Sequence, residues 1–229
     1  QPEEPRAREQ ALRRALDAWS RPPITLESET YLPAGQSSGF LQSSPGMIVQ
    51  FSIYGLITTA MILVLERKSR ALQRLLTTSV SRASIIAGHL AAMFLIIWLQ
   101  QASLVACGQL VFHVNYLRAP GATLLVMSAL ALWSASLGLL VAALARSEQQ
   151  VIMYSLAAMF LFCALGGAWF PLDVAGAGFA RIGRLTPGAW AMDGFQSILL
   201  RGGGLVSVLR PAGLLAACAA AFFGLALWR

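Results

Sequence analysis

Apolar residues are concentrated in long, nearly uncharged runs that are separated by short polar segments. Five such runs lie near residues 47–65, 85–112, 121–145, 149–170 and 209–228. Each is close to the roughly 20 apolar residues that an α-helix needs to cross a bilayer. The pattern predicts an all-α polytopic membrane protein with about five transmembrane helices.

Composition supports a membrane location. The 229 residues are 57% hydrophobic and only 12% charged, whereas a soluble domain typically has about 25% charged residues. The net charge of +7 comes from arginines at the ends of apolar runs, so membrane topology explains it better than nucleic-acid binding. The three cysteines lie inside apolar runs without metal-ligand spacing, which indicates neither a disulfide framework nor a metal site.

The N-terminal part of the chain has a different pattern. Residues 3–20 place apolar side chains at helical spacing, and Pro22 and Pro23 end that helix before a Gly/Ser/Pro-rich loop. We predict that residues 1–45 are the C-terminal end of an extracytoplasmic domain and that 46–229 form the transmembrane domain. The sequence begins without a signal-peptide pattern, and we expect an upstream part with at least one more membrane helix.

A short basic segment, residues 66–82, separates the first two apolar runs. Its leucines recur at helical spacing and its basic residues project largely elsewhere, which predicts an amphipathic helix. Because Lys and Arg near span ends favour the cytoplasmic side, we predict that this helix and the C-terminus are cytoplasmic and that the N-terminal segment is outside. Three arginines are discordant with this rule, because they lie on the predicted outer side: Arg181, Arg184 and Arg201.

The segment before the last apolar run, residues 171–204, is too apolar for a free loop. Its prolines and glycines divide it into pieces that are too short to span a bilayer. Such pieces fit re-entrant or interfacial helices, which are tolerated at membrane depth where they are buried in protein or line a water-filled cavity. We predict an outer gate formed by Phe170, Pro171, Pro187 and Trp190.

Two ordered motifs resemble the ABC-2-type transporter permeases. The first is "PGMIVQFSIYGLITTAMILVLERKSRALQRLLTTSVSRASIIAGH", residues 45–89. The second is "LGGAWFPLD" followed by "IGRLTPGAWAMDGFQSILLRGGG", which ends at Gly204. The resemblance covers roughly 45–229. The chain departs from the family pattern at Ser79, where the family often has Pro, and at Lys68-Ser69-Arg70, which replaces a frequent Gly-Thr.

The resemblance implies six spans in a full subunit, of which this chain would hold spans two to six. It also implies that the basic segment is a coupling helix seated in a cleft of an ABC ATP-binding subunit. The positions that match this helix are Glu66, Arg67, Lys68, Arg70, Arg74, Leu75, Leu76, Ser79 and Arg82.

The partners and cofactors that the resemblance implies lie outside this chain. The sequence contains no G-x-x-x-x-G-K-[ST] phosphate loop, so we expect no cofactor in this chain and ATP and Mg bound by the partner subunit. A second permease subunit, identical or different, and membrane lipids are the other expected partners, and no nucleic acid is expected. The expected location is the inner membrane of a bacterium.

The function that follows is that of a permease subunit of an ATP-driven ABC-2 exporter for a hydrophobic drug or lipid-like compound, with no enzymatic site of its own. One alternative is an integral membrane enzyme that uses Asp173 and Asp193 at the outer interface, although no nucleophile–base pair or metal cluster accompanies them. Another is a secondary transporter, disfavoured because the spans lack acids and an evident inverted repeat. Within the spans, we expect interhelical hydrogen bonds from Gln100, Gln101, Gln109, Ser134 and Ser136.

Overall fold

The computed structural model describes Arg13 and residues 38–69, 82–174 and 176–228. The chain divides into two compact units, Gln1–Gly35 and Gln36–Arg229, and the fold described below is that of the second. The predicted N-terminal amphipathic helix lies outside the described residues apart from Arg13, and so does most of the predicted coupling helix.

All secondary-structure elements in the described part of the chain are helices, as the apolar runs predicted. Five of its helices are long and apolar enough to cross a membrane. In chain order the elements are α2 (Ser38–Lys68), α4 (Arg82–Leu110), the 3-10 turn η1 (Tyr116–Arg118), α5 (Pro120–Leu144), α6 (Glu148–Leu165), the 3-10 turn η2 (Leu172–Val174), α7 (Ala177–Gly183), α8 (Pro187–Leu199) and α9 (Leu205–Trp228).

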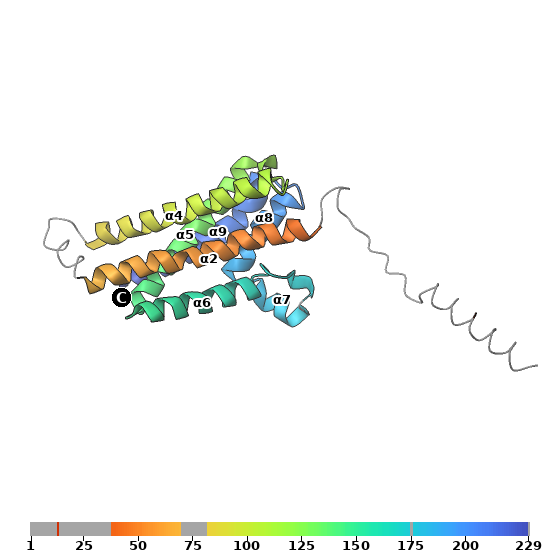
Figure 1. Cartoon of the computed structure of the whole chain (residues 1–229). Coiled ribbons are helices and arrows are strands. Elements are labelled where there is room, and N and C mark those ends of the chain that lie inside the picture. Colours follow the sequence, from red (N-terminus) through yellow and green to blue (C-terminus); the bar gives the residue numbers. More distant parts are fainter. Residues whose placement is uncertain (1–12, 14–37, 70–81, 175, 229) are drawn as a thin grey trace, which may run out of the picture. The chain divides into compact units, whose positions relative to one another are not determined.

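Helix α5 is the centre of the bundle. It packs against α2, α4 and α9 (Figure 1), and 72% of its membrane-length window is buried inside the protein, against 17% for α4. Trp133 on α5 is fully buried. At Gly138 the helix comes close to Leu56 and Thr59 of α2, because small residues let membrane helices approach closely. The sides of α4, α6 and α9 that face away from α5 expose large apolar side chains.

Helix α2 extends the predicted span 47–65 at both ends. It begins at Ser38 and continues through Pro45. Two polar residues added before the apolar run bond to distant parts of the chain: Gln42 donates to the Gly167 carbonyl (2.8 Å), and Ser44 shares a hydrogen bond with the Tyr116 hydroxyl (2.8 Å). Tertiary hydrogen bonds therefore lengthen the helix beyond its apolar run.

Polar side chains join α2 to α4 in the middle of the bundle. The Gln101 amide donates to Ser52 Oγ (2.8 Å), and Gln100 donates to the Phe51 carbonyl (3.1 Å). These bonds confirm the interhelical role predicted for both glutamines. The prediction was wrong for Ser136, whose hydroxyl donates to Leu132 on its own helix, since a serine can bond to the carbonyl one turn earlier.

Two other polar residues from that prediction make no bond between membrane helices. Gln109 accepts a hydrogen bond from the Leu117 N–H in turn η1 (3.1 Å), so it holds a loop and not a second span. The Ser134 hydroxyl is buried without a hydrogen-bond partner in the part of the chain that the structure describes.

Tyr116 connects four helices where α4 turns into α5. Its fully buried ring meets Gly108 of α4 and packs edge-on against Phe195 of α8, 6.2 Å between ring centroids. Its hydroxyl bonds to Ser44 of α2, and its carbonyl accepts from Thr123 of α5 (2.8 Å). Burial raises the pKa of Tyr116 well above its usual range, against a smaller lowering by the Ser44 bond, so the phenol stays protonated.

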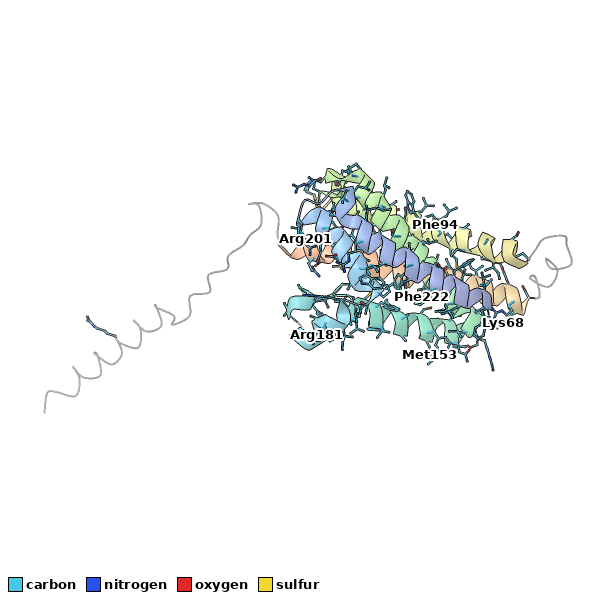
Figure 2. All side chains as sticks on the ribbon, turned by 180° about the vertical axis from the view of Figure 1, so that it is seen from behind. Lys68, Phe94, Met153, Arg181, Arg201 and Phe222 are labelled. Carbon is cyan, nitrogen blue, oxygen red and sulfur yellow. The ribbon has the colours of Figure 1, made fainter. Side chains whose placement is uncertain are left out.

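The bundle has two ends that differ in structure. The Lys68 end holds the C-termini of α2, α5 and α9 and the N-termini of α4 and α6, and the α8 end holds the opposite termini together with η1, α7 and α8. Figure 2 shows Lys68 at one end and Arg181 and Arg201 at the other. The five long helices therefore alternate in direction along the chain.

We expect Tyr116→Phe to lower the free energy of unfolding by about 1 kcal/mol, because Ser44 loses its partner. Tyr116→Ala should cost about 3–5 kcal/mol, since it also removes the buried ring. The measurement is thermal unfolding of the purified protein in neutral detergent. Tyr154→Phe, at an exposed tyrosine on α6, is the control, and equal effects of the two Phe variants would contradict this role.

Candidate functional site

The short helices before the last span begin and end at identifiable residues. Thr186 is the N-cap of α8: its hydroxyl accepts from the Ala189 N–H (3.4 Å) and donates to the Gly183 carbonyl at the end of α7 (2.7 Å). Pro187 follows at the first helical position, where its missing N–H is not needed. The prediction of short helices in this segment is confirmed.

Glycines bring three helices against the C-terminal end of α6. A Cβ at Gly188 of α8 would overlap the Phe162 carbonyl, and one at Gly183 of α7 would overlap the Leu165 carbonyl. Gly46 of α2 meets the Ala168 carbonyl just after α6 in the same way. These backbone contacts fix α8, α7 and the start of α2 around one helix end.

A cavity of about 480 Å³ lies at this end of the bundle. It lies between α8, the first turns of α9, the start of α2 and the connection from α6 to α7. Its lining is formed by Gln42, Gly166, Gly167, Pro171, Leu172, Arg184, Ala189, Trp190, Met192, Asp193, Gln196, Arg201, Arg210, Pro211 and Leu214. Its volume is typical of a site for a small molecule.

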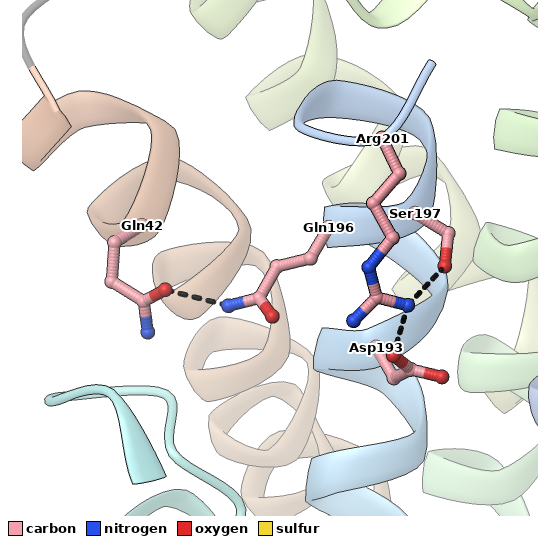
Figure 3. Close-up of polar contacts among 5 residues, drawn as sticks. All are labelled: Gln42, Asp193, Gln196, Ser197 and Arg201. Carbon is pink, nitrogen blue, oxygen red and sulfur yellow. Dashed lines mark hydrogen bonds and ion pairs between the residues drawn. The ribbon is translucent and has the colours of Figure 1, made fainter. Parts of the chain in front are cut away.

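Three hydrogen bonds order side chains at the cavity (Figure 3). Gln196 of α8 donates to Gln42 of α2 (2.6 Å), which bridges the cavity's two walls. Arg201 Nη1 donates to Asp193 (3.0 Å) and to Ser197 (3.3 Å), which holds its guanidinium against α8. The exposure of the Asp193–Arg201 pair limits its contribution to stability to about 1 kcal/mol or less.

The predicted gate residues occupy different places in this region. Pro171 and Trp190 line the cavity, and the Trp190 indole donates to the Arg184 carbonyl (3.0 Å). Phe170 lies beside Phe179 of α7, 6.2 Å between ring centroids, while Pro187 is buried at the start of α8. The structure thus brings two of the four to the cavity.

Three polar residues of the cavity were not selected from the sequence. Gln42 lies before the first apolar run, and Arg210 lies at the edge of the last one. Gln196 lies in residues 171–204, where the prolines and glycines, and not the polar residues, supported the prediction of short helices. The signal that could have found Arg210 is an arginine just inside a predicted span, where a charge is costly. No sequence pattern marks Gln42, because its role depends on a contact between distant segments.

At the Lys68 end, the first residues of the predicted coupling segment belong to α2. Arg67 donates to the Ala142 carbonyl (3.1 Å) and Ala145 carbonyl (3.5 Å), which are unpaired groups at the C-terminal end of α5. Cations are favoured at helix C-termini, where the helix dipole is negative. Arg67 therefore joins the end of α2 to the central helix.

One ion pair and one contact between a carboxylate and a histidine connect the same end of α2 to its other neighbours. Lys68 pairs with Glu148 in the first turn of α6 (2.8 Å), and Glu66 lies 3.2 Å from the His89 ring nitrogen on α4. Arg82 begins α4. The remaining coupling positions, for which the structure gives no placement, are Arg70, Arg74, Leu75, Leu76 and Ser79.

The side chains at these sites are suited to binding a ligand or a partner. Among the residues that the structure describes, no group of three or more His, Cys, Asp or Glu could hold a metal ion. The cavity offers guanidinium and amide donors, one carboxylate and apolar walls. Such a set can hold a polar or charged group of a ligand next to an apolar one.

Five apolar helices of membrane-crossing length define the chain as a multi-pass membrane protein. A sequence profile narrows that class, because the profile described as "ABC-2 family transporter protein" matches residues 10–228. The chain belongs to this ABC-2 family of transporter permeases, which confirms the resemblance carried by the two motifs.

Two relatives show how the chain compares with longer proteins. It is 29% identical over 188 residues to the linearmycin resistance permease protein LnrN of Bacillus subtilis strain 168, which covers 82% of this chain and 49% of that protein. It is 27% identical over 163 residues to ABC transporter G family member 20 of Dictyostelium discoideum, covering 71% of this chain and 22% of that protein. The chain therefore spans about half and about a fifth of their lengths. No solved structure matched the chain.

We expect Gly188→Ala to destabilise the α8 end by about 1–3 kcal/mol, because the added methyl group must displace the Phe162 carbonyl. The measurement is the apparent melting temperature in neutral detergent. Gly178→Ala, in α7 where an added Cβ meets nothing within 4 Å, should leave that temperature unchanged or slightly raised. Equal melting temperatures for the two variants would show that the close contact at Gly188 is not a constraint.

Proposed function

We propose that this chain is the membrane part of an ATP-driven ABC-2 exporter that moves a hydrophobic or lipid-like compound. ATP would be hydrolysed by a separate ATP-binding subunit, which receives the coupling segment 66–82 in a cleft. The observation that carries this proposal, within a chain of the ABC-2 family, is the anchoring of α2 at Glu66, Arg67 and Lys68 to α4, α5 and α6.

This anchoring gives a physical route from a docked partner to the bundle. A force on the residues after Lys68 would act on the end of α2, and Arg67 would pass it to the C-terminus of α5. Close-packed helices move as rigid elements with few intermediate arrangements. Because α5 also packs against α8, movement at the Lys68 end would reach the cavity at the α8 end.

The orientation that fits this proposal places the Lys68 end in the cytoplasm of a bacterium and the α8 end outside. The basic residues after α2 favour the cytoplasmic side, where ATP is available. The cavity would then open near the outer face of the inner membrane, at the end of the pathway from which an exported compound leaves.

A second permease subunit, identical or different, would complete the exporter. The exposed apolar sides of α4, α6 and α9 supply surface for both lipid and a neighbouring subunit, with Leu95 and Leu99 of α4 more than half exposed. The substrate would pass between the two subunits. Trp190 and Pro171, which line the cavity, would act with the short helices as the outer gate.

Neither alternative function gains a specific observation. The carboxylate of Asp193 is paired with Arg201, whose Nη1 also donates to the Ser197 hydroxyl, so these groups hold the arginine in place and give no specific support to an interfacial enzyme. A proton-coupled transporter needs ionisable groups inside the bundle, and the buried polar residues within the described ranges are Ser, Thr and Gln.

The test is purification of the full-length protein from its native membranes with Arg70→Glu and Arg74→Glu together. We expect co-purified ATPase activity to fall about tenfold or more, because charge reversal opposes docking at a complementary surface. The ATPase chain is identified by mass spectrometry through its phosphate loop.

The control is Arg181→Glu, which makes one such charge reversal at the exposed end of α7. This variant should retain the ATPase. If the coupling variant keeps its ATPase to the same extent, or if no ATPase co-purifies with the unmodified protein, the proposed function is wrong.

A further inference from the structure

We propose that the cavity at the α8 end binds the anionic head group of an amphiphile, a phosphate or carboxylate attached to an apolar chain. This inference rests on the proposed function, because it names the substrate class at the cavity of the exporter. It is carried by the charge, the free donors and the apolar walls of the lining.

The described lining residues carry an excess of positive charge. Arg184 has an interaction of its own and is left out of this balance. The two other arginines of the lining, Arg201 and Arg210, are accompanied by one carboxylate, that of Asp193. Arg210, six residues into α9, has no hydrogen bond or ion pair to any residue with a described side chain. An arginine stays charged at every physiological pH, so its partner must be water or an anion.

Arg201 is held in place with donors left over. A guanidinium has five N–H groups, and Asp193 and Ser197 both accept from Nη1. Neither Nη2 nor Nε has a partner within the described part of the chain. The contact with Asp193 therefore fixes the guanidinium on α8, while two nitrogen atoms remain for a phosphate or carboxylate, which an arginine can bind through two hydrogen bonds.

The same cavity has apolar walls beside these donors. Leu172, Pro211 and Leu214 line it together with Trp190. An inorganic anion would use only the arginines, whereas an amphiphile would also remove these side chains from water, at about 25 cal/mol per Å² of apolar surface. The lining thus fits a ligand with one charged end and one apolar end.

Further arginines surround the cavity and give the whole α8 end a positive field. The Arg118 guanidinium lies against Gly202, where a Cβ would be 2.7 Å from Nη2, and Arg181 is exposed on α7. Under the proposed orientation these arginines are on the outer side, against the usual distribution of positive charge. Of the arginines that are discordant in this way, Arg201 lines the cavity, and binding of an anion there gives its charge a function.

The probe is radiolabelled dodecyl phosphate, added to the full-length protein in nanodiscs of phosphatidylcholine. The variant is Arg210→Gln, which removes a charge and keeps a polar side chain, and the matched control is Arg181→Gln outside the cavity lining. We expect the Kd to rise about tenfold or more for Arg210→Gln, because a charge-assisted hydrogen bond is lost, and to stay within about twofold for Arg181→Gln. Binding should weaken with salt, which screens exposed charges.

A second variant tests Arg201 without leaving a carboxylate unpaired. In the double variant Arg201→Gln with Asp193→Asn, the pair becomes two neutral amides of similar shape. Its Kd for dodecyl phosphate should also rise about tenfold or more. Melting temperatures of all variants in the same nanodiscs show whether a loss of binding comes from unfolding, and a folded variant with unchanged binding contradicts the proposal.

Two competitors identify the source of the head group. If phosphatidylglycerol in the nanodisc displaces the probe, the cavity takes the phosphate of a membrane lipid; if it does not, the cavity takes a single-chain compound, and both results support an anionic amphiphile. Displacement by inorganic phosphate at the same concentration as dodecyl phosphate would overturn the proposal, because the apolar walls would then contribute nothing. Absence of saturable binding would overturn it as well.

The binding result and the ATPase result separate the two proposals. If the ATPase co-purifies and dodecyl phosphate does not bind, the proposed function stands and the inference about the cavity is wrong. If the probe binds through Arg210 and no ATPase co-purifies, the cavity is an anion site of a protein that is not an ATP-driven exporter.

Discussion

Close backbone contact at the C-terminal end of α6 is the constraint on which the α8 end depends. Gly188, Gly183 and Gly46 come from three different helices, and each meets a carbonyl of the last turn of α6 or of the residues just after it. Any side chain at these positions would move its helix away. Helix α8 is therefore held inside the bundle, which is the condition for a non-spanning helix at membrane depth, while α7 is mostly exposed and touches α6 at its buried Gly183.

The cavity follows from this arrangement. Because α8 is fixed against α6, another side of α8 faces α9 and the start of α2 across the cavity. The hydrogen bond from Gln196 to Gln42 joins α8 to α2 there. Polar residues of α2 outside the apolar run take part, and so the helix begins at Ser38. The central helix α5 supports both ends, with Tyr116 joining it to α2, α4 and α8 at one of them.

The sequence predicted the parts of this fold that depend on local pattern. Apolar runs gave the number and order of the spans, and Pro187 with the surrounding glycines indicated the short helices. The sequence could not show which of these residues reach the cavity, because all of them belong to one short segment with the same general pattern. In the structure Pro171 and Trp190 line the cavity, whereas Phe170 lies beside Phe179. Gln42 and Arg210 were missed since their role arises only when the segments meet. The apolar run also did not predict the full length of α2, which depends on hydrogen bonds to Gly167 and Tyr116.

The two ends of the bundle use arginine in opposite ways. At the Lys68 end, Arg67 is bonded to the carbonyls that end α5, so its charge is balanced by the helix dipole and serves to join helices. At the α8 end, Arg210 lies in the second turn of α9, away from any helix C-terminus, and no described side chain balances it. A residue that stabilises nothing around it and opens into a cavity is available for a ligand, and this separates a connecting end from a binding end within one helical bundle.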